Sequence, residues 1–135
     1  MYSARNRSAC IRIPVTGSWP KAKRIEFRVP DPSSNPYLAF SVALAGAMEG
    51  IRAGHEPSLA VDENLVRYDD AELVRLGIPS LPQTLGDALY LLAESDLVRS
   101  ALGDYVCDQF LQVKRAEWSD YRRYVSPWER ERDGD

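Results

Sequence analysis

The segment that decides the fold reads Lys23-Arg24-Ile25-Glu26-Phe27-Arg28-Val29, in which charged and apolar residues alternate. Successive side chains of a β-strand point to opposite faces of the sheet, so this alternation predicts a strand. One face of the strand is apolar and consists of Ile25, Phe27 and Val29. The opposite face carries three charged side chains, Arg24, Glu26 and Arg28, with about 7 Å between alternate residues.

A second strand is predicted upstream, over Ala9–Ile13. Here Arg12 shares a face with Cys10, and the apolar residues occupy the other face. Pro14 ends this strand, and residues 16–20 contain the glycine and proline typical of a turn. The two segments therefore predict a short antiparallel strand pair. No other segment has a strand pattern, although two strands alone are marginally stable.

Helical patterns fill most of the remaining chain. Asn35 followed by Pro36 is a favoured helix start, and the helix is expected to run to about Ala53, before Gly54. Apolar residues cover most of its circumference, which predicts that much of it is buried. Further helices are expected over Asp69–Leu76, Leu85–Glu94, Ser95–Gly103 and Asp104–Tyr124, with a last turn from Ser126. Thr84 and Asp104 are expected to cap two of them, and the inward face of the long one is expected to hold Val106, Phe110, Val113 and Tyr121. The predicted class is α+β, a strand pair followed by a mostly helical bundle.

Composition excludes several classes of protein. The 135 residues are 44% hydrophobic, which is ordinary for one globular domain and far from the signature of disorder. The longest apolar stretch, residues 37–48, is too short to span a bilayer, and the first thirty residues show no secretory signal. Two distant cysteines and a single histidine exclude a disulfide framework and a zinc site built from Cys and His. We therefore expect a cytoplasmic protein with no membrane partner.

Charge is distributed unevenly along the chain. Residues 1–28 contain seven Lys and Arg residues and one acid, Glu26, which gives +6. Because the whole chain carries −3, the remainder carries −9. This asymmetry predicts that the basic N-terminal segment meets an anionic partner.

The charged face of the strand is open to three interpretations. Two guanidinium groups can bind carboxylate or phosphate oxygens, and the Glu26 carboxylate between them can pair with them or hold a hard cation such as Mg²⁺. Arg7 and Arg12 would add two more cations, which fits phosphoryl transfer. The second interpretation is a solvated row of salt bridges on a surface strand. The third is a nucleic-acid patch, which is least favoured because no aromatic residue on that face could stack on bases.

Four sequence blocks in the first forty residues point to a known family. They are Tyr2–Ala9, Arg12–Pro14, Pro20–Arg28 and Pro30–Leu38. In this order they resemble the C-terminal part of the glutamine synthetase family. The resemblance covers nearly all of this chain and the last third or less of a typical member.

The resemblance implies an ATP-dependent ligase that phosphorylates the side-chain carboxylate of glutamate and then lets ammonia or another small amine displace the phosphate. Its cofactors would be ATP and Mg²⁺ or Mn²⁺. By this resemblance Glu26 is a metal ligand. Arg7 and Arg28 are catalytic residues that hold glutamate and the transferred phosphoryl group. The implied ATP contacts are Arg12, Arg24 and Lys21, the last of these near the base.

The resemblance also implies how the chain is organised. Residues 1–30 would carry the active-site strands and residues 35–131 the helical part, while the family's N-terminal domain and the first part of its catalytic domain are expected to be absent. The full-length parent would form a homo-oligomeric ring, with no nucleic-acid partner, and the isolated chain is expected to be inactive.

Two departures from the family pattern bear on function. Val66 stands where many bacterial members carry a modifiable tyrosine. The stretches Lys114–Trp118 and Val125–Arg130 resemble a divergent branch found in actinobacteria, in which some members join glutamate to polyamines or other amines. A γ-glutamyl-polyamine ligase is therefore one alternative, and a non-catalytic binding or structural module is another.

Overall fold

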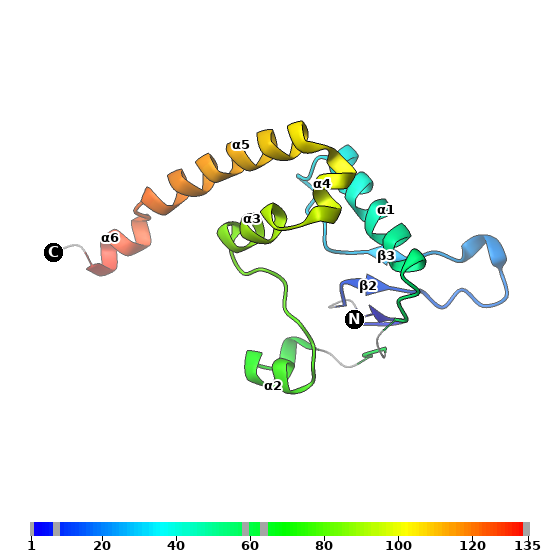
Figure 1. Ribbon diagram of the computed structural model, residues 1–135. Helices are drawn as coiled ribbons and strands as arrows, with labels where there is room; N and C mark the ends of the chain where they lie inside the picture. The colour runs from blue at the N-terminus through cyan, green and yellow to red at the C-terminus, as the bar shows by residue number, and fades with distance from the viewer. Residues whose placement is uncertain (1, 7–8, 58–59, 63–64, 134–135) are drawn as a thin grey trace. The chain divides into compact units, whose positions relative to one another are not determined.

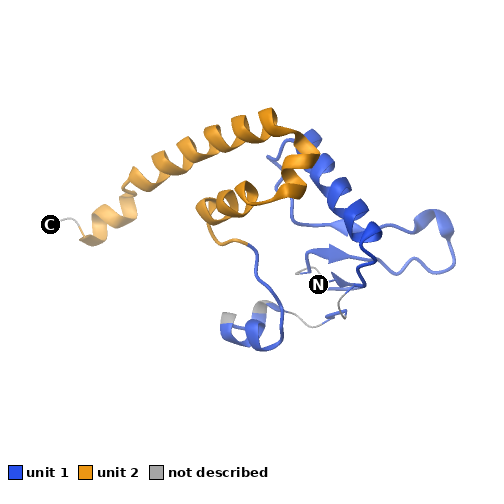
Figure 2. Cartoon of the chain, in the orientation of Figure 1, with its two compact units in different colours: residues 1–81 blue, residues 82–135 orange. Residues whose placement is uncertain are grey.

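The computed structural model describes residues 2–6, 9–57, 60–62 and 65–133. The chain divides into two compact units, unit 1 over Met1–Leu81 and unit 2 over Pro82–Asp135 (Figure 2). Each unit is described by itself below.

A three-stranded sheet forms the N-terminal part of unit 1 (Figure 1). Its strands are β1 (Tyr2–Ser3), β2 (Ile11–Arg12) and β3 (Glu26–Phe27), in the order β1-β2-β3. β2 and β3 are antiparallel, and Arg12 pairs with Glu26. The predicted antiparallel pair is thus confirmed, although both strands are shorter than expected. The prediction that no other segment forms a strand was wrong, because β1 pairs in parallel with β2, with Ser3 opposite Arg12.

The apolar face of β3 is not covered within the described part of the chain. Ile25, Phe27 and Val29 are 65%, 49% and 40% exposed. The well-buried residues of the sheet region are instead small, with Ser3 at 0% and Ala9 at 1% exposure. The sheet is therefore held mainly by its backbone ladder, which extends past the strands through the bonds Ile13 N–H to Ser3 O and Arg28 N–H to Cys10 O, both 2.9 Å.

Helix α1 (Pro36–Arg52) begins where the sequence predicts. The Asn35 side chain accepts hydrogen bonds from the backbone N–H groups of Tyr37 and Leu38, at 3.0 and 3.3 Å. The helix is followed by Ala53 and then Gly54, whose φ of 65° is the left-handed conformation that glycine adopts without strain.

The expectation that much of α1 is buried was wrong for this chain. No described residue of α1 is buried, and one continuous face exposes large apolar side chains. These are Tyr37, Phe40, Leu44, Met48 and Ile51, all between 40% and 81% exposed. Their spacing of three and four residues places them in one stripe along the helix. The sequence identified the apolar residues, but nothing in the described residues packs over this stripe, hereafter the α1 stripe.

The cap of α1 gives a first stability prediction. Replacing Asn35 by alanine leaves two N–H groups without their acceptor, so we expect unit 1 to lose about 1 kcal/mol of unfolding free energy. Urea titration followed by circular dichroism measures this loss. Asn35→Asp should retain most of the stability because its carboxylate accepts the same bonds. Equal losses in the two variants would contradict the capping role.

Between the sheet and unit 2 the chain forms short elements. The 3₁₀ turn η1 (Pro20–Ala22) lies within the connection between β2 and β3. A second 3₁₀ turn, η2 (Leu65–Arg67), precedes α2 (Asp70–Arg75). The helix predicted over 69–76 is present as α2, and Asp69 caps it in a reciprocal pair with Glu72. Val66 lies in η2, and residues 63–64 just before it are outside the described part.

Unit 2 is helical throughout and comprises α3 (Leu85–Ala93), α4 (Asp96–Leu102), α5 (Asp104–Arg123) and α6 (Pro127–Asp133). The predicted cap Thr84 is confirmed, since its side chain accepts a backbone N–H. Ser95, where the sequence predicts the start of the next helix, caps α4 in the same way. Asp104 was predicted to cap α5, but Gly103 occupies the cap position and Asp104 lies in the first turn. There its carboxylate accepts from Arg99 at 3.0 Å, which ties the end of α4 to the start of α5.

α3 and α4 both pack on α5, and the core of unit 2 is small. It consists of Leu89, Cys107 and Leu111, each at most 4% exposed. The predicted inward face of α5 was wrong for three of its four residues, since Val106, Val113 and Tyr121 are 37%, 62% and 69% exposed, whereas Phe110 is half-buried. The buried residues of α5 are instead Cys107 and Leu111, which lie four residues apart on one face of the helix. The small Cys107 side chain lets a neighbouring helix pack closely against this face.

One further contact in unit 2 is close. Gly86 in α3 lies against the indole of Trp118 in α5, where a Cβ at position 86 would be 2.6 Å from the indole Nε1. In the described ranges, no helix is both long and apolar enough to cross a membrane.

Candidate functional site

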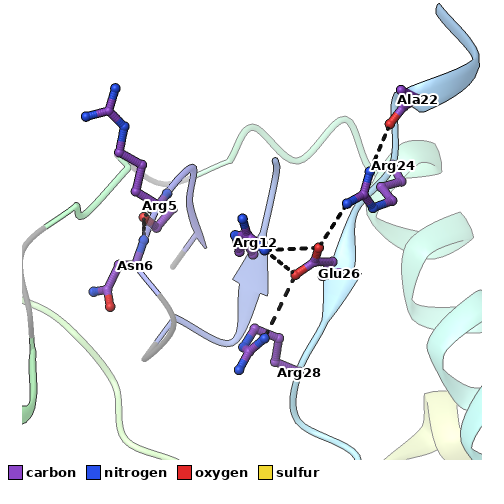
Figure 3. Close-up of polar contacts among 8 residues, drawn as sticks. Arg5, Asn6, Arg12, Ala22, Arg24, Glu26 and Arg28 are labelled. Atoms are coloured by element: carbon purple, nitrogen blue, oxygen red, sulfur yellow. Dashed lines mark hydrogen bonds and ion pairs between the residues drawn. The ribbon is translucent and has the colours of Figure 1, made fainter. Parts of the chain in front are cut away.

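The pairing of β2 with β3 brings two oppositely charged side chains together. Arg12 pairs with Glu26 across the ladder, so both side chains lie on one face of the sheet. The Arg12 Nη1 donates to both carboxylate oxygens of Glu26, at 3.1 Å to Oε1 and 2.9 Å to Oε2 (Figure 3). This contact fixes the carboxylate over the sheet.

Two further arginines flank the same carboxylate. Arg24 and Arg28 lie two residues before and after Glu26, which puts all three side chains on one face, as the sequence predicts. The Arg24 Nη2 is 3.5 Å from Glu26 Oε1, and the Arg28 Nη1 is 3.9 Å from Oε2 (Figure 3). These four residues, Arg12, Arg24, Glu26 and Arg28, are called the charged cluster below.

The charged cluster has an excess of positive charge. Three guanidinium groups surround one carboxylate, which leaves a formal charge of +2. The hydrogen bond from Arg12 is the main cause that lowers the pKa of Glu26. Burial opposes it, and the positive charges of Arg12, Arg24 and Arg28 lower the pKa further. Glu26 is therefore ionised at neutral pH. The cluster is suited to binding an anion that carries several oxygens.

Arg12 also has an unused donor. Its Nε is buried and has no hydrogen-bond partner among the described residues, whereas its Nη1 is bonded to Glu26. A buried N–H without an acceptor is unfavourable by about 1–3 kcal/mol.

Acid is expected to weaken the charged cluster. The pKa of Glu26 is lowered by folding, so its contribution is complete above the ordinary value of 4.5 and is lost as the pH falls through the lower pKa of the folded chain. We expect the urea midpoint of unit 1 to fall on acidification from pH 6 to pH 3. The midpoint of Glu26→Gln should fall less over this range, because that variant has no carboxyl to protonate. Parallel pH profiles for the two proteins would contradict this assignment.

Known proteins of similar sequence indicate the family of this chain. The family model described as the catalytic domain of glutamine synthetase matches residues 1–133. The chain belongs to the glutamine synthetase family. The resemblance seen in the sequence is thereby confirmed.

Glutamine synthetases from other organisms align with almost the whole chain. The enzyme of Methanocaldococcus jannaschii is 41% identical over 128 residues, which cover 95% of this chain and 28% of that protein. The glutamine synthetase of Mycolicibacterium smegmatis is 40% identical over 129 residues, covering 95% of this chain and 29% of its own length. The chain thus spans a little more than a quarter of these relatives.

A solved structure of the same family has the same fold. It is a GmaS/ADP complex with a TM-score of 0.81 and 31% identity, and the match covers 97% of this chain and 28% of that one. The small sheet followed by helices is therefore the C-terminal part of the glutamine synthetase catalytic fold, as predicted.

The structure brings together only some of the residues expected from the glutamine synthetase resemblance. Arg12, Arg24, Glu26 and Arg28 form the charged cluster. Lys21 lies in η1 and is exposed, within a connection between β2 and β3 that extends beyond the sheet (Figure 1). No ion pair in the described part of the chain joins it to the cluster. Arg7 lies outside the described residues.

Ser3 and Asp62 were not singled out from the sequence. The Ser3 hydroxyl is fully buried, donates to Asp62 Oδ1 at 2.5 Å, and lies one strand away from Arg12. Folding lowers the pKa of Asp62, chiefly through this hydrogen bond. A two-residue strand has no alternation to reveal it, so only the parallel pairing of β1 with β2 identifies this neighbour of the cluster.

The described residues provide only part of the ligand set that a divalent cation needs. Among the described residues, no group of three or more acidic, histidine or cysteine side chains could hold a metal ion. The Glu26 carboxylate fits one position of a hard-cation site, because it is ionised and oxygen-based.

Proposed function

We propose that the charged cluster binds the phosphate groups of ATP together with a divalent cation, as part of a ligase of the glutamine synthetase family. The reaction would join an amine to the side-chain carboxylate of glutamate through γ-glutamyl phosphate. The observation that carries the proposal is the set of three guanidinium groups around Glu26 on one sheet face. The ADP complex of the solved relative supports the choice of nucleotide.

The family resemblance implies a role for each cluster residue, and the chemistry of each side chain is compatible with that role. Arg12 and Arg24 would hold phosphate oxygens through their guanidinium groups. Arg28 would hold the transferred phosphoryl group and the glutamate substrate. Glu26, kept anionic by its neighbours, would contribute one oxygen ligand to Mg²⁺ or Mn²⁺. When bound, the cation neutralises charge on the phosphates.

Other residue roles come from the family resemblance and remain part of the proposal. Arg7 would act with Arg28 on glutamate and the phosphoryl group, and Lys21 would lie near the nucleotide base. Residues 1–30 would then contain the site, and residues 35–131 the helical part of the domain. The amine is ammonia or another small amine, and the ending Val125–Arg130 makes a polyamine a specific alternative.

The cluster geometry implies that cation and nucleotide bind together. Mg²⁺ alone would approach a carboxylate already surrounded by three positive groups. A nucleotide alone would compete with Glu26 for the same arginines. Bound together, the phosphates take the arginines while the cation takes the carboxylate, so every charge has a partner.

Calorimetric titration of the full chain tests the proposal. We expect saturable binding of ADP in the presence of Mg²⁺, and at least about tenfold weaker binding of ADP with EDTA, since one charge-assisted contact accounts for such a factor. Mg²⁺ alone should give no saturable heat. A folded chain that does not bind Mg–ADP would contradict the proposal and favour the non-catalytic module.

A further inference from the structure

Four contacts place residues 60–62 against β1, the strand next to β2 of the charged cluster. Tyr2 forms a parallel bridge with Ala60, and the Val61 N–H donates to Tyr2 O at 3.0 Å. Asp62, two residues after Ala60, accepts through its Oδ1 from the Ser3 hydroxyl at 2.5 Å and from the Ala4 N–H at 3.3 Å. Asp62 is thus tied to the end of β1, 59 positions away from Ser3 in the chain.

The Ser3 hydroxyl connects this carboxylate to the turn that follows β1. It accepts from the backbone N–H groups of Arg5 and Asn6, at 3.2 and 2.8 Å. A hydroxyl has one hydrogen to donate and two lone pairs to accept with, so the bonds to Asp62, Arg5 and Asn6 use its full capacity. Ser3 is 0% exposed, so its hydroxyl has no access to solvent in the folded chain.

This network is adjacent to the cluster. Ser3 lies opposite Arg12 in the β1–β2 register, and the Ile13 N–H donates to Ser3 O at 2.9 Å. Arg12 in turn lies opposite Glu26. The turn with Arg5 and Asn6 follows β1, the strand next to the one that carries Arg12 (Figure 3). A shift of β1 would therefore be transmitted to Arg12 through the backbone ladder.

We propose that Ser3 and Asp62 are positioning residues. The Asp62 carboxylate acts through the Ser3 hydroxyl and so holds β1 and residues 4–6 in register with Arg12. The effect on ligand affinity rests on the nucleotide-binding role proposed above. The effect on the geometry of the charged cluster is independent of that proposed role, because it requires no ligand. Neither residue needs to contact the ligand.

A series of variants separates this role from a general loss of stability. Asp62→Ala removes the acceptor of the Ser3 hydroxyl, whereas Asp62→Asn keeps an oxygen that can accept the same bonds. Asp31→Ala is the matched control. Asp31 also accepts from a serine hydroxyl and a backbone N–H, both of Ser33, but in the local loop after β3. Asp62 and Asp31 are both exposed, so neither variant leaves a cavity in the core.

Two nuclear magnetic resonance measurements without ligand test the geometry. In Asp62→Ala we expect the Arg5 and Asn6 amides to exchange with solvent about tenfold faster, and the Arg12 Nε–H resonance to shift. Asp62→Asn should stay close to the wild type, and Asp31→Ala should change neither signal. An unshifted Arg12 resonance in Asp62→Ala overturns the inference, whatever binds to the protein.

Calorimetry with Mg–ADP tests the functional consequence. We expect a loss of about three- to tenfold in affinity in Asp62→Ala, restoration in Asp62→Asn, and no change in Asp31→Ala. Equal affinities of Asp62→Ala and Asp31→Ala would overturn the positioning role. A wild-type chain that binds no Mg–ADP would instead overturn the proposed function, while the two resonance measurements would still decide the inference.

Discussion

Arg12→Ala is expected to weaken Mg–ADP binding by about 30- to 100-fold, the largest effect of any single substitution in the charged cluster. This arginine makes the shortest contact with Glu26, at 2.9 Å, and carries the buried Nε without a partner. Its removal loses donors to the phosphates and also frees the carboxylate that would meet the cation. Calorimetric titration at constant ionic strength measures the change.

Two comparison variants make the Arg12 result specific. Arg12→Lys keeps the charge but loses the planar set of donors, so we expect it to recover only a small part of the affinity. Arg75→Ala removes the same charge from an exposed position at the end of α2 and should bind like the wild type. Similar losses in Arg12→Ala and Arg75→Ala would mean that overall charge, and not the cluster, determines binding.

Leu111→Ala is expected to destabilise unit 2 by about 2–4 kcal/mol. Leu111 is 4% exposed and belongs to a core of only three well-buried side chains, so little else compensates for the cavity. Urea unfolding followed by circular dichroism measures the loss. Val113→Ala is the matched control on the same helix, because Val113 is 62% exposed and should change the unfolding free energy by less than about 0.5 kcal/mol. A Leu111→Ala loss as small as that of Val113→Ala would contradict the assignment of the core.

Local features of the fold could be predicted from the sequence because neighbouring residues determine them. The caps at Asn35, Thr84 and Ser95 need only one side chain and the N–H groups two or three residues later. The pairing of the β2 and β3 segments follows from two alternating runs joined by a turn. The predicted cap at Asp104 was wrong, because its carboxylate pairs with Arg99 in the preceding helix and not with a backbone N–H.

What covers a helix face could not be predicted, because that depends on residues far away in the chain. The α1 stripe was identified as apolar from its composition, yet its five side chains remain exposed in the described residues. In α5 the large residues Val113 and Tyr121 suggested the wrong face. The packing contact instead uses Cys107, whose small side chain carries little weight in a hydrophobicity pattern.

Some residues of the candidate site could likewise be predicted from the sequence, and others could not. The two-residue period of a β-strand places Arg24, Glu26 and Arg28 on one face, and the antiparallel pairing adds Arg12. The charged cluster could therefore be predicted from the sequence. Ser3 and Asp62 were not, since their contact joins two segments without a shared pattern. Lys21 was expected at the nucleotide from the family resemblance alone, and the structure leaves that role as a proposal.

The contact between Gly86 and Trp118 gives unit 2 an intrinsic optical signal. Of the three tryptophans, Trp19 and Trp128 are 73% and 63% exposed, whereas Trp118 is half-buried against α3 and stacks on Tyr121 at 5.5 Å. An indole shielded from water emits at shorter wavelength than exposed ones. The blue edge of the tryptophan emission therefore reports the docking of α3 on α5 without any attached dye, so that the unfolding of unit 2 can be followed separately from that of the sheet.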